Sequence, residues 1–403
     1  MISSGRGRTY AKRFWASFGV FFVLAVAFNF YQSGQRDDNA SYDSASAATP
    51  KTLEQYKITR DGTALWVPTY VSQSLNAPDP TIRRAVIVIH GVSRNAVDYY
   101  DYAAANTGGV PGMVTVAPRF ATSSDSPAAG QLYWTSTWSE CGQSSSNLPW
   151  RIASCAVLDE MIASLYANFK NLNSVVIMGN SAGGQITTRY AAASADTRNR
   201  YIVSAPSSYL YMTPQRWSAS KNAFAIPSTS CTTYNDYKHG YNRLSSNTYM
   251  NAVGASNLTS RYGAAKVTFI IGSLDNDPND PNLDTSCEGM AQGSQRVERM
   301  QNFYKYLPTV YGAQAYSNKR MEIVDGYAHS ARNVLGSAQA KAAIMEGFST
   351  ALKGDLNGDG SVNVFDLSKL LSAWETADAV ADIDHSGTVN IFDLSALLTS
   401  WTK

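Results

Sequence analysis

The chain has 403 residues, which is enough to bury a substantial core and more than one ordinary small domain requires. With 44% apolar and 16% charged residues, its composition is that of a folded soluble protein. The formal net charge is +2 and no basic run occurs beyond the N-terminus, so nothing in the charge pattern points to nucleic acid or an acidic membrane surface as a partner.

Residues 1–34 have the order of an export signal. Four basic residues between positions 6 and 13 precede the uncharged, largely apolar stretch 14–28. This stretch lacks the polar positions at helical spacing that a cytosolic core helix would show. Two fates are open: cleavage after the small-x-small segment 25–27, or retention as a single membrane anchor, since roughly 17 apolar residues just span a bilayer. Either way, the sequence predicts a secreted or extracellular protein.

Residues 35–52 are polar and have no apolar period, which predicts a flexible linker. Residues 53–352 then alternate short, β-branched apolar runs with helical stretches, as expected for an α/β fold with right-handed crossovers. The runs are nearly continuous, which is typical of parallel strands buried on both faces. A hairpin around Asp61-Gly62 is expected at an antiparallel edge of the sheet. The strand candidates are 85–89, 114–117, 174–178, 201–204, 267–271 and 321–324, and helices are expected at 153–169 and 294–307.

The segment 179–183 (GNSAG) follows the strand candidate SVVIM directly and precedes a helical stretch that starts near Gly184. This is the G-x-S-x-G nucleophile elbow in its strand–turn–helix context. Side chains at the glycine positions would clash with the neighbouring strand and helix. The turn raises the serine hydroxyl off the end of the sheet, and N–H groups at the helix start face the attacked carbonyl. We therefore predict Ser181 as the nucleophile.

A nucleophilic serine requires a base, and the chain has four histidines. His385 lies in the C-terminal segment, His239 has no preceding strand, and His90 with the following glycine suits an oxyanion loop. His329 follows the last strand candidate, where the order Ser…Asp…His places the base. We predict His329 as the base.

The acid is expected between the serine and the histidine along the chain. Asp275 follows the strand candidate 267–271, at the carboxyl end where ligands gather in open α/β sheets. Asp277 is the alternative, whereas Asp280 and Asp284 are interpreted as loop residues that face solvent. For the oxyanion hole, we expect backbone N–H groups of Ala182 and, after the strand candidate 85–89, of Val92. This reaction requires no cofactor.

Five segments together resemble the α/β-hydrolase superfamily, over roughly residues 55–350. They are 90–102 (HGVSRNAVDYYDY), 179–184 (GNSAGG), 205–211 (APSSYLY), 272–278 (GSLDNDP) and 326–330 (GYAHS). The resemblance implies an α/β-hydrolase fold and Ser–Asp–His chemistry, but it does not identify the substrate. Segment 205–211 and the aromatic segment 133–138 (YWTSTW) are interpreted either as walls of the site or as core.

After Lys353 the chain contains two copies of one unit, since 364–374 (VFDLSKLLSAW) closely matches 391–401 (IFDLSALLTSW). Each copy begins with a twelve-residue loop whose oxygen-bearing residues stand at calcium-loop positions, with glycine at position 6. We predict two structural calcium ions. The candidate ligands are Asp355, Asn357, Asp359, Ser361, Asn363 and Asp366 in the first loop, and Asp382, Asp384, Ser386, Thr388, Asn390 and Asp393 in the second.

These loop–helix units resemble the type I dockerin family over residues 354–403, which implies a small all-α calcium-binding domain that docks onto a cohesin-like scaffold protein. Dockerins often accompany polysaccharide-degrading enzymes. The chain departs from the usual pattern at loop positions 10 and 11, where Val364-Phe365 and Ile391-Phe392 are apolar. The two phenylalanines are interpreted either as docking anchors or as contacts between the helices.

All four cysteines lie beyond the export segment, and an oxidising compartment favours disulfides. Three pairings are possible, of which Cys141–Cys155 with Cys231–Cys287 is preferred; four free thiols are the alternative. Together these features predict an exported serine hydrolase acting on carboxylic esters, with acyl groups on polysaccharide favoured. A lipase, polyester depolymerase or peptidase with the same triad is a second interpretation, and a non-catalytic surface-binding protein is a third.

Overall fold

The computed structural model describes residues 50–145, 148–349 and 352–402. The predicted export segment and all but the last residues of the predicted linker lie outside these ranges. Among the described residues, no helix has both the length and the apolar character needed to cross a membrane.

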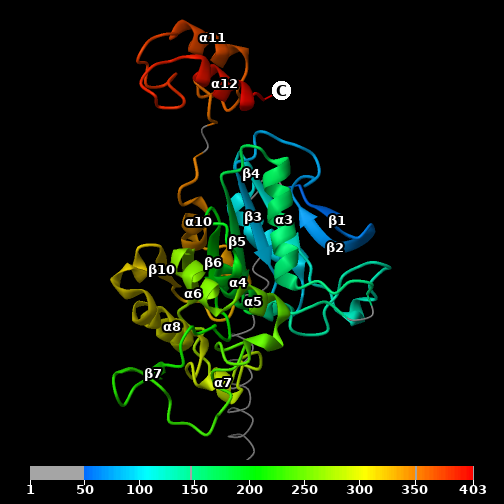
Figure 1. Cartoon of the computed structure of the whole chain (residues 1–403), viewed down its shortest axis with the longest axis vertical. Helices are drawn as coiled ribbons and strands as arrows, with labels where there is room; N and C mark the ends of the chain where they lie inside the picture. The colour runs from blue at the N-terminus through cyan, green and yellow to red at the C-terminus, as the bar shows by residue number, and fades with distance from the viewer. Residues whose placement is uncertain (1–49, 146–147, 350–351, 403) are drawn as a thin grey trace, which may run out of the picture. The chain divides into compact units, whose positions relative to one another are not determined.

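Eight strands form one sheet, whose order is β1-β2-β4-β3-β5-β6-β9-β10 (Figure 1). All the predicted strands are present, and each is one or two residues longer than expected. The strands of this sheet are β1 (Thr52–Arg60), β2 (Thr63–Val71), β3 (Arg84–Ile89), β4 (Met113–Pro118), β5 (Ser174–Asn180), β6 (Arg200–Ser204), β9 (Lys266–Gly272) and β10 (Lys319–Val324). A separate short hairpin consists of β7 (Arg216–Ser218) and β8 (Ala223–Ala225).

The predicted antiparallel edge is confirmed: β1 and β2 form a hairpin, and β2 pairs antiparallel with β4. The other pairings in the sheet are parallel. Strands β3 and β5 are buried over their whole length, which explains why their sequences are continuous apolar runs without alternation. A mostly parallel sheet places the carboxyl ends of β3, β5, β6, β9 and β10 at one edge.

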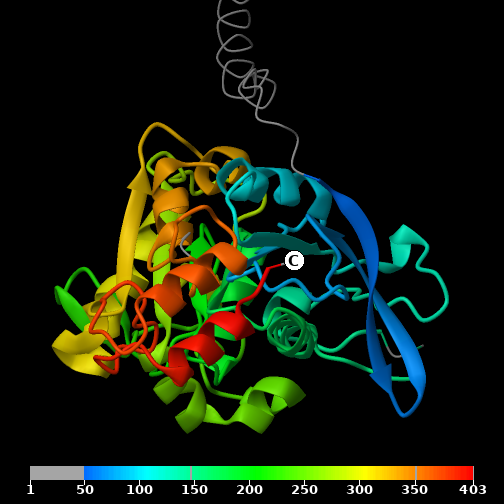
Figure 2. The same ribbon diagram turned by 90° about the horizontal axis from the view of Figure 1, so that it is seen from above.

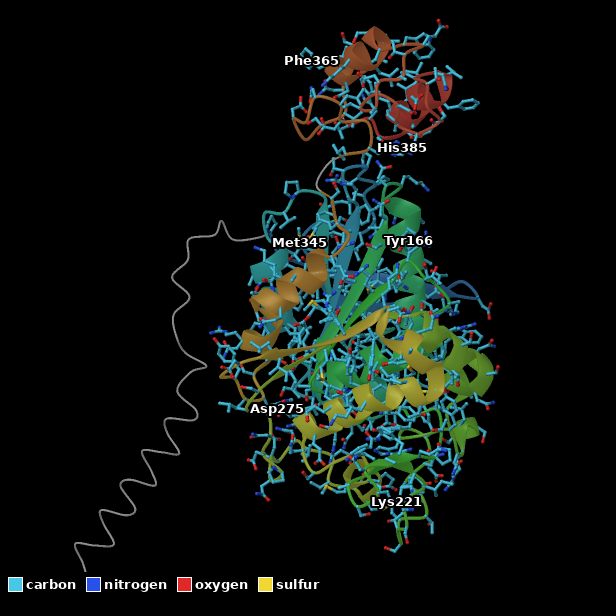
Figure 3. All side chains as sticks on the ribbon, turned by 90° about the vertical axis from the view of Figure 1, so that its left-hand side faces the viewer. Tyr166, Lys221, Asp275, Met345, Phe365 and His385 are labelled. Atoms are coloured by element: carbon cyan, nitrogen blue, oxygen red, sulfur yellow. A yellow bond between two sulfur atoms is a disulfide. The ribbon has the colours of Figure 1, made fainter. Side chains whose placement is uncertain are left out.

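Helices cover both faces of the sheet (Figure 2). In chain order they are α2 (Ala96–Thr107), α3 (Ser154–Asn168), α4 (Ala182–Ala193), α5 (Thr248–Val253), α6 (Ala255–Ala264), α7 (Cys287–Met290), α8 (Arg296–Tyr311), α9 (Ala331–Leu335) and α10 (Ala338–Met345). Alternate strand residues divide between two apolar clusters. One contains side chains of α3, α4, α6 and α8, and the other contains side chains of α2, α9 and α10. Figure 3 shows Tyr166 of α3 and Met345 of α10 on opposite sides of the sheet.

Helix α8 begins and ends later than the expected range 294–307 and continues through Pro308. A proline inside a helix leaves the carbonyl four residues earlier without its usual donor. Here that carbonyl belongs to Tyr304, and it accepts a hydrogen bond from the Tyr316 hydroxyl at 3.3 Å. The replacement donor comes from outside the helix, so the sequence of the helix alone does not reveal it.

Both preferred disulfides are present, Cys141–Cys155 and Cys231–Cys287. The first joins the segment before α3 to the start of α3. The second ties the start of α7 to a loop that lies 56 residues earlier in the chain.

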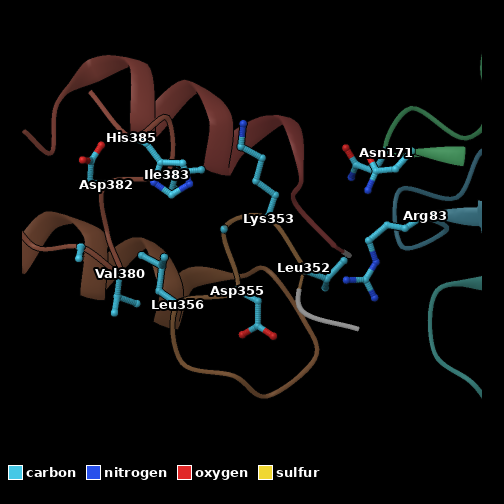
Figure 4. A pocket seen from close by; sticks show the side chains of 13 residues that line it. Arg83, Asn171, Leu352, Lys353, Asp355, Leu356, Val380, Asp382, Ile383 and His385 are labelled. Carbon is cyan, nitrogen blue, oxygen red and sulfur yellow. The ribbon is translucent and has the colours of Figure 1, made fainter. Parts of the chain in front are cut away.

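The C-terminal region has helices α11 (Val364–Ser372) and α12 (Ile391–Thr399) and an apolar cluster of its own. The second residues of the two loops, Leu356 and Ile383, are both buried in this cluster (Figure 4). Each helix begins at an asparagine in a capping box, and the two asparagines have nearly identical backbone angles. The duplication seen in the sequence is thus also a duplication of backbone geometry.

Candidate active site

Ser181 lies in the turn between β5 and α4, with φ of 59° and ψ of −121°. Residues other than glycine rarely adopt these backbone angles, so the surrounding structure must hold Ser181 in this conformation. A Cβ added to Gly183 would overlap the Ile89 carbonyl oxygen, and one added to Gly184 would overlap the Ser204 carbonyl oxygen. The glycines thus allow α4 to approach β3 and β6 closely, as the sequence predicted for a nucleophile elbow.

The predicted base and acid are in direct contact. His329 Nδ1 lies 2.7 Å from Asp275 Oδ2, and the carboxylate of Asp275 is buried (labelled in Figure 3). When Nδ1 donates to this carboxylate, Nε2 carries a lone pair that can accept a proton. Two backbone hydrogen bonds join the loops that carry these side chains: Ser273 N donates to Val324 O, and Leu274 N donates to Tyr327 O, each at 2.9 Å.

The sheet order places all three predicted triad residues at one edge, because they follow the neighbouring parallel strands β5, β9 and β10, with only β6 between the first two. Ser181 N donates to Ser204 O at 3.0 Å, and Ala205 N donates to Ile270 O at 3.3 Å, so this edge is connected across β6. In the described part of the chain, no hydrogen bond joins the Ser181 hydroxyl to His329. In enzymes without substrate such bonds are often long, and this contact stays a prediction.

The sequence analysis missed Arg296, the first residue of α8, which is buried against the acid. Its Nη1 lies 3.2 Å from Asp275 Oδ1 and 3.0 Å from Asp280 Oδ2. The interpretation of Asp280 as a residue that only faces solvent was therefore wrong. The sequence contained one signal. Arg296 stands in the first turn of a helix predicted to pack on the sheet, and a buried arginine requires a partner, although the sequence does not show which residue that partner is.

The other aspartates differ in their roles. Asp277 Oδ1 accepts from Asn279 N at 2.8 Å, which makes it part of a turn rather than the partner of His329. The interpretation of Asp284 was also wrong, because its Oδ2 lies 3.0 Å from Nε2 of the buried His239. Burial of Asp284 opposes its ionisation, but hydrogen bonds from His239 and Ser286 hold the pKa of this carboxyl well below its usual range.

The loop after β3 lies against the nucleophile elbow, since a Cβ on Gly183 would meet the His90 carbonyl oxygen at 2.6 Å. His90 is buried, with Nε2 accepting from Phe120 N at 2.9 Å, so Nδ1 carries the proton that is donated to Gly91 O at 2.8 Å. Burial lowers the pKa of His90 to about 3. Both ring nitrogens of His90 are thus hydrogen-bonded to the backbone, and the side chain supports the loop after β3.

The two predicted oxyanion donors belong to the two segments that meet at this contact. Ala182 is the first residue of α4, where backbone N–H groups have no partner within the helix. Val92 follows in the loop after β3, and its side chain is exposed. The contact of Gly183 with the β3 loop brings the two segments side by side at the edge that holds Ser181.

The two aromatic segments belong to the core. Trp134 and Trp138 of segment 133–138 are buried, and the Trp138 ring packs on His90 with centroids 4.6 Å apart. Tyr209 and Tyr211 of segment 205–211 are fully buried around Phe303 of α8. Of the two interpretations left open, core packing describes these four rings.

The second C-terminal loop brings three carboxylates close together. Carboxylate oxygens of Asp382, Asp384 and Asp393 all lie within 4.8 Å of one another. At loop position 6, Gly360 and Gly387 have φ of 87° and 92°, which a side chain would strain. This donor set consists of hard oxygen atoms, which is the chemistry that Ca²⁺ prefers.

Comparisons with known proteins identify the fold. No family model matches the sequence, and no curated protein matches it. Among solved structures, a poly(aspartic acid) hydrolase from Sphingomonas sp. KT-1 is similar, with a TM-score of 0.50 and 19% identity over 73% of this chain and 98% of that one. A poly(3-hydroxybutyrate) depolymerase from Bordetella parapertussis has a TM-score of 0.49 and 18% identity, covering 74% of this chain and 89% of that one.

At these identities the likeness shows the fold alone. The chain has an α/β-hydrolase fold, with an eight-stranded, mostly parallel sheet and flanking helices, as the sequence analysis predicted. Among solved proteins, the poly(aspartic acid) hydrolase shares this fold.

Proposed function

We propose that the protein is an exported serine esterase that cleaves carboxylic esters through an acyl-enzyme intermediate on Ser181. The observation that carries the proposal is the 2.7 Å contact between His329 and the buried Asp275, at the sheet edge where the strained Ser181 follows β5. A buried carboxylate, an imidazole and a serine on an elbow form the constellation that acyl transfer requires.

In the proposed mechanism, His329 Nε2 takes the proton of Ser181 as the hydroxyl attacks the ester carbonyl. Asp275 holds the imidazole tautomer and stabilises the imidazolium that forms. The N–H groups of Ala182 and Val92 stabilise the oxyanion, and each such donor typically lowers the barrier by about 2.7–4 kcal/mol. His329 then returns the proton to the leaving alcohol, and a water activated by the same imidazole releases the acid.

Labelling with a fluorophosphonate probe tests this proposal directly. The wild-type protein should be labelled and should hydrolyse p-nitrophenyl acetate, and both properties should be lost in Ser181→Ala. Ser194→Ala is the matched control, because Ser194 lies at the other end of α4. If Ser181→Ala keeps the wild-type rate, or if the folded wild-type protein is inert to both reagents, the esterase proposal is wrong.

For the C-terminal region we propose a dockerin-like module with two structural calcium ions. The first ion would be held by the loop that begins at Asp355, and the second by the loop that begins at Asp382, through the oxygen atoms named above. The side chains of Phe365 (labelled in Figure 3) and Phe392 are 69% and 68% exposed, which excludes the interpretation that they join the helices and supports docking to a cohesin-like scaffold. Such modules accompany polysaccharide-degrading enzymes, which favours acyl groups on polysaccharide as the substrate.

Calorimetry with a purified type I cohesin tests the docking proposal. We expect binding that requires calcium and that is weakened when Phe365 and Phe392 are both replaced by serine. Binding that is independent of calcium and of these substitutions would contradict the docking proposal, and so would the absence of binding to the cohesin.

One observation favours a second substrate class, apolar polyester chains. Three exposed apolar side chains come from the loops that carry the proposed site: Val92, Leu274 and Tyr327. Leu274 immediately precedes the proposed acid, and Tyr327 lies two residues before the proposed base. Exposed apolar residues beside a reactive centre suit an apolar substrate. Acetylated xylan and a polyhydroxybutyrate film, compared under equal conditions, distinguish the two classes.

A further inference from the structure

A buried guanidinium contacts the acid that we place behind His329. The side chain of Arg296 is 1% exposed and that of Asp275 is 3% exposed. Arg296 Nη1 lies 3.2 Å from Asp275 Oδ1, whereas the other carboxylate oxygen, Oδ2, lies 2.7 Å from His329 Nδ1. Each oxygen of this carboxylate therefore has its own partner, and only one of them faces the imidazole.

The guanidinium is itself held on all of its nitrogen atoms. Nη1 lies 3.0 Å from Asp280 Oδ2, Nη2 donates to Asp280 Oδ1 at 3.2 Å, and Nε donates to Ser207 Oγ at 3.3 Å. Because a guanidinium is a planar fork, partners on each of its nitrogens determine both its place and its orientation. One cation is thus shared between two carboxylates and fixed against rotation.

The backbone of α8 contributes to the same arrangement. Val297 N, one residue after Arg296, donates to the carbonyl oxygen of Asp275 at 3.2 Å. The Gln295 side chain caps the helix by accepting from Glu298 N at 3.0 Å. The arginine therefore projects from the first turn of a capped, sixteen-residue helix that is bonded to the loop of the acid. A group placed by such an element is held more accurately than one on a free loop.

Burial makes this partner necessary. A carboxylate taken out of water is strongly disfavoured unless it is paired and hydrogen-bonded. Before proton transfer the imidazole of His329 is neutral, so it offers Asp275 one hydrogen bond but no charge. Arg296 supplies the positive charge, and by occupying Oδ1 it leaves Oδ2 directed at the imidazole.

We propose that Arg296 is a positioning residue of the triad, which stabilises the ionised Asp275 and directs its Oδ2 towards His329, with Asp280 holding the guanidinium. This inference rests on the proposed esterase function. It extends the Ser–Asp–His set by a fourth side chain that touches neither the substrate nor the serine. Its effect should appear in the chemical step and in the state of the imidazole, and much less in substrate binding.

The test compares Arg296→Met and Arg296→Lys with Asp277→Asn as the control, all in the full chain. For Arg296→Met we expect kcat for p-nitrophenyl acetate to fall about 10- to 100-fold, as for loss of one charge-assisted hydrogen bond, with KM changed less than about threefold. Arg296→Lys, which keeps the charge but not the fork, should recover part of the loss. Asp277→Asn is the control and should stay within about threefold of the wild type, because the Asp277 carboxylate accepts a hydrogen bond within its own turn and contacts neither Arg296 nor His329.

A second measurement does not depend on turnover. The hydrogen-bonded Nδ1 proton of His329 should give a low-field proton resonance that is absent in His329→Gln, shifted or lost in Arg296→Met, and kept in Asp277→Asn. Wild-type protein without esterase activity but with this pattern would refute the reaction and support the positioning role. Arg296→Met with wild-type kcat and an unchanged resonance would overturn the inference, and so would a loss confined to thermal stability.

Discussion

Replacement of Asp275 by asparagine tests the proposed triad most directly, because it changes charge and donor pattern without changing size. The carboxylate has two partners, His329 at 2.7 Å and Arg296 at 3.2 Å. An asparagine that turns its carbonyl oxygen to the arginine must turn its NH₂ group to His329 Nδ1. That nitrogen then has to accept, so the proton moves to Nε2 and the imidazole can no longer act as a base towards Ser181.

The expected loss is large. In a Ser–His–Asp triad, the wrong histidine tautomer lowers kcat by about 10⁴-fold, which corresponds to about 5.5 kcal/mol of barrier. The free energy of unfolding should change much less than the barrier, because Arg296 keeps its contacts with Asp280. The assay is kcat for p-nitrophenyl acetate, corrected for folded protein by circular dichroism and thermal unfolding.

The matched control is Asp277→Asn, since Asp277 lies two residues away and bonds only within its own turn. This variant should keep activity within about threefold of the wild type, because the amide oxygen of asparagine can accept the same hydrogen bond from Asn279 N. If Asp275→Asn retains more than a tenth of the wild-type kcat while folded, the assignment of Asp275 as the acid is refuted. If instead Asp277→Asn is the inactive variant, the acid is the alternative weighed in the sequence analysis.

Three further outcomes are expected. Gly183→Ala should destabilise the fold by several kcal/mol in denaturant unfolding, because its Cβ would overlap the Ile89 carbonyl oxygen; a stable, active variant would contradict the close approach at the elbow. Asp284→Asn should lower stability at pH 7. Because the pKa of Asp284 is depressed in the folded state, its contribution is complete above the ordinary value of 3.8 and declines as pH falls further, so the wild-type and variant curves should converge in acid; a difference that grows in acid would refute this. Removal of calcium with a chelator should lower the unfolding temperature of the C-terminal module without changing esterase kcat, and differential scanning calorimetry with and without added calcium measures this. Identical scans would argue against the calcium sites.

Local patterns in the sequence were enough to predict the elements and the nucleophile. The buried strands are recognisable because parallel strands covered on both faces must be continuous apolar runs, as in β3 and β5. The elbow is recognisable because only glycines permit the close approach around Ser181. The pairing of Asp275 with His329 followed from chain order and from the fact that parallel strands end at one edge. The duplication in the tail was visible because one unit is repeated with little change.

The tertiary structure alone decided the partners that the chain brings together from distant, irregular segments. Arg296 and Asp280 flank Asp275, and His239 meets Asp284, yet no period or motif in the sequence relates these positions. From the sequence, the tyrosines of segment 205–211 could belong either to the core or to a wall of the site. In the folded chain they pack against Phe303 of α8, which places them in the core. The physical reason is that local periodicity reports which face of an element is buried, whereas the energy of a buried charge depends on which side chain packs against it. That choice is made by loops and helix termini only when the whole chain is folded.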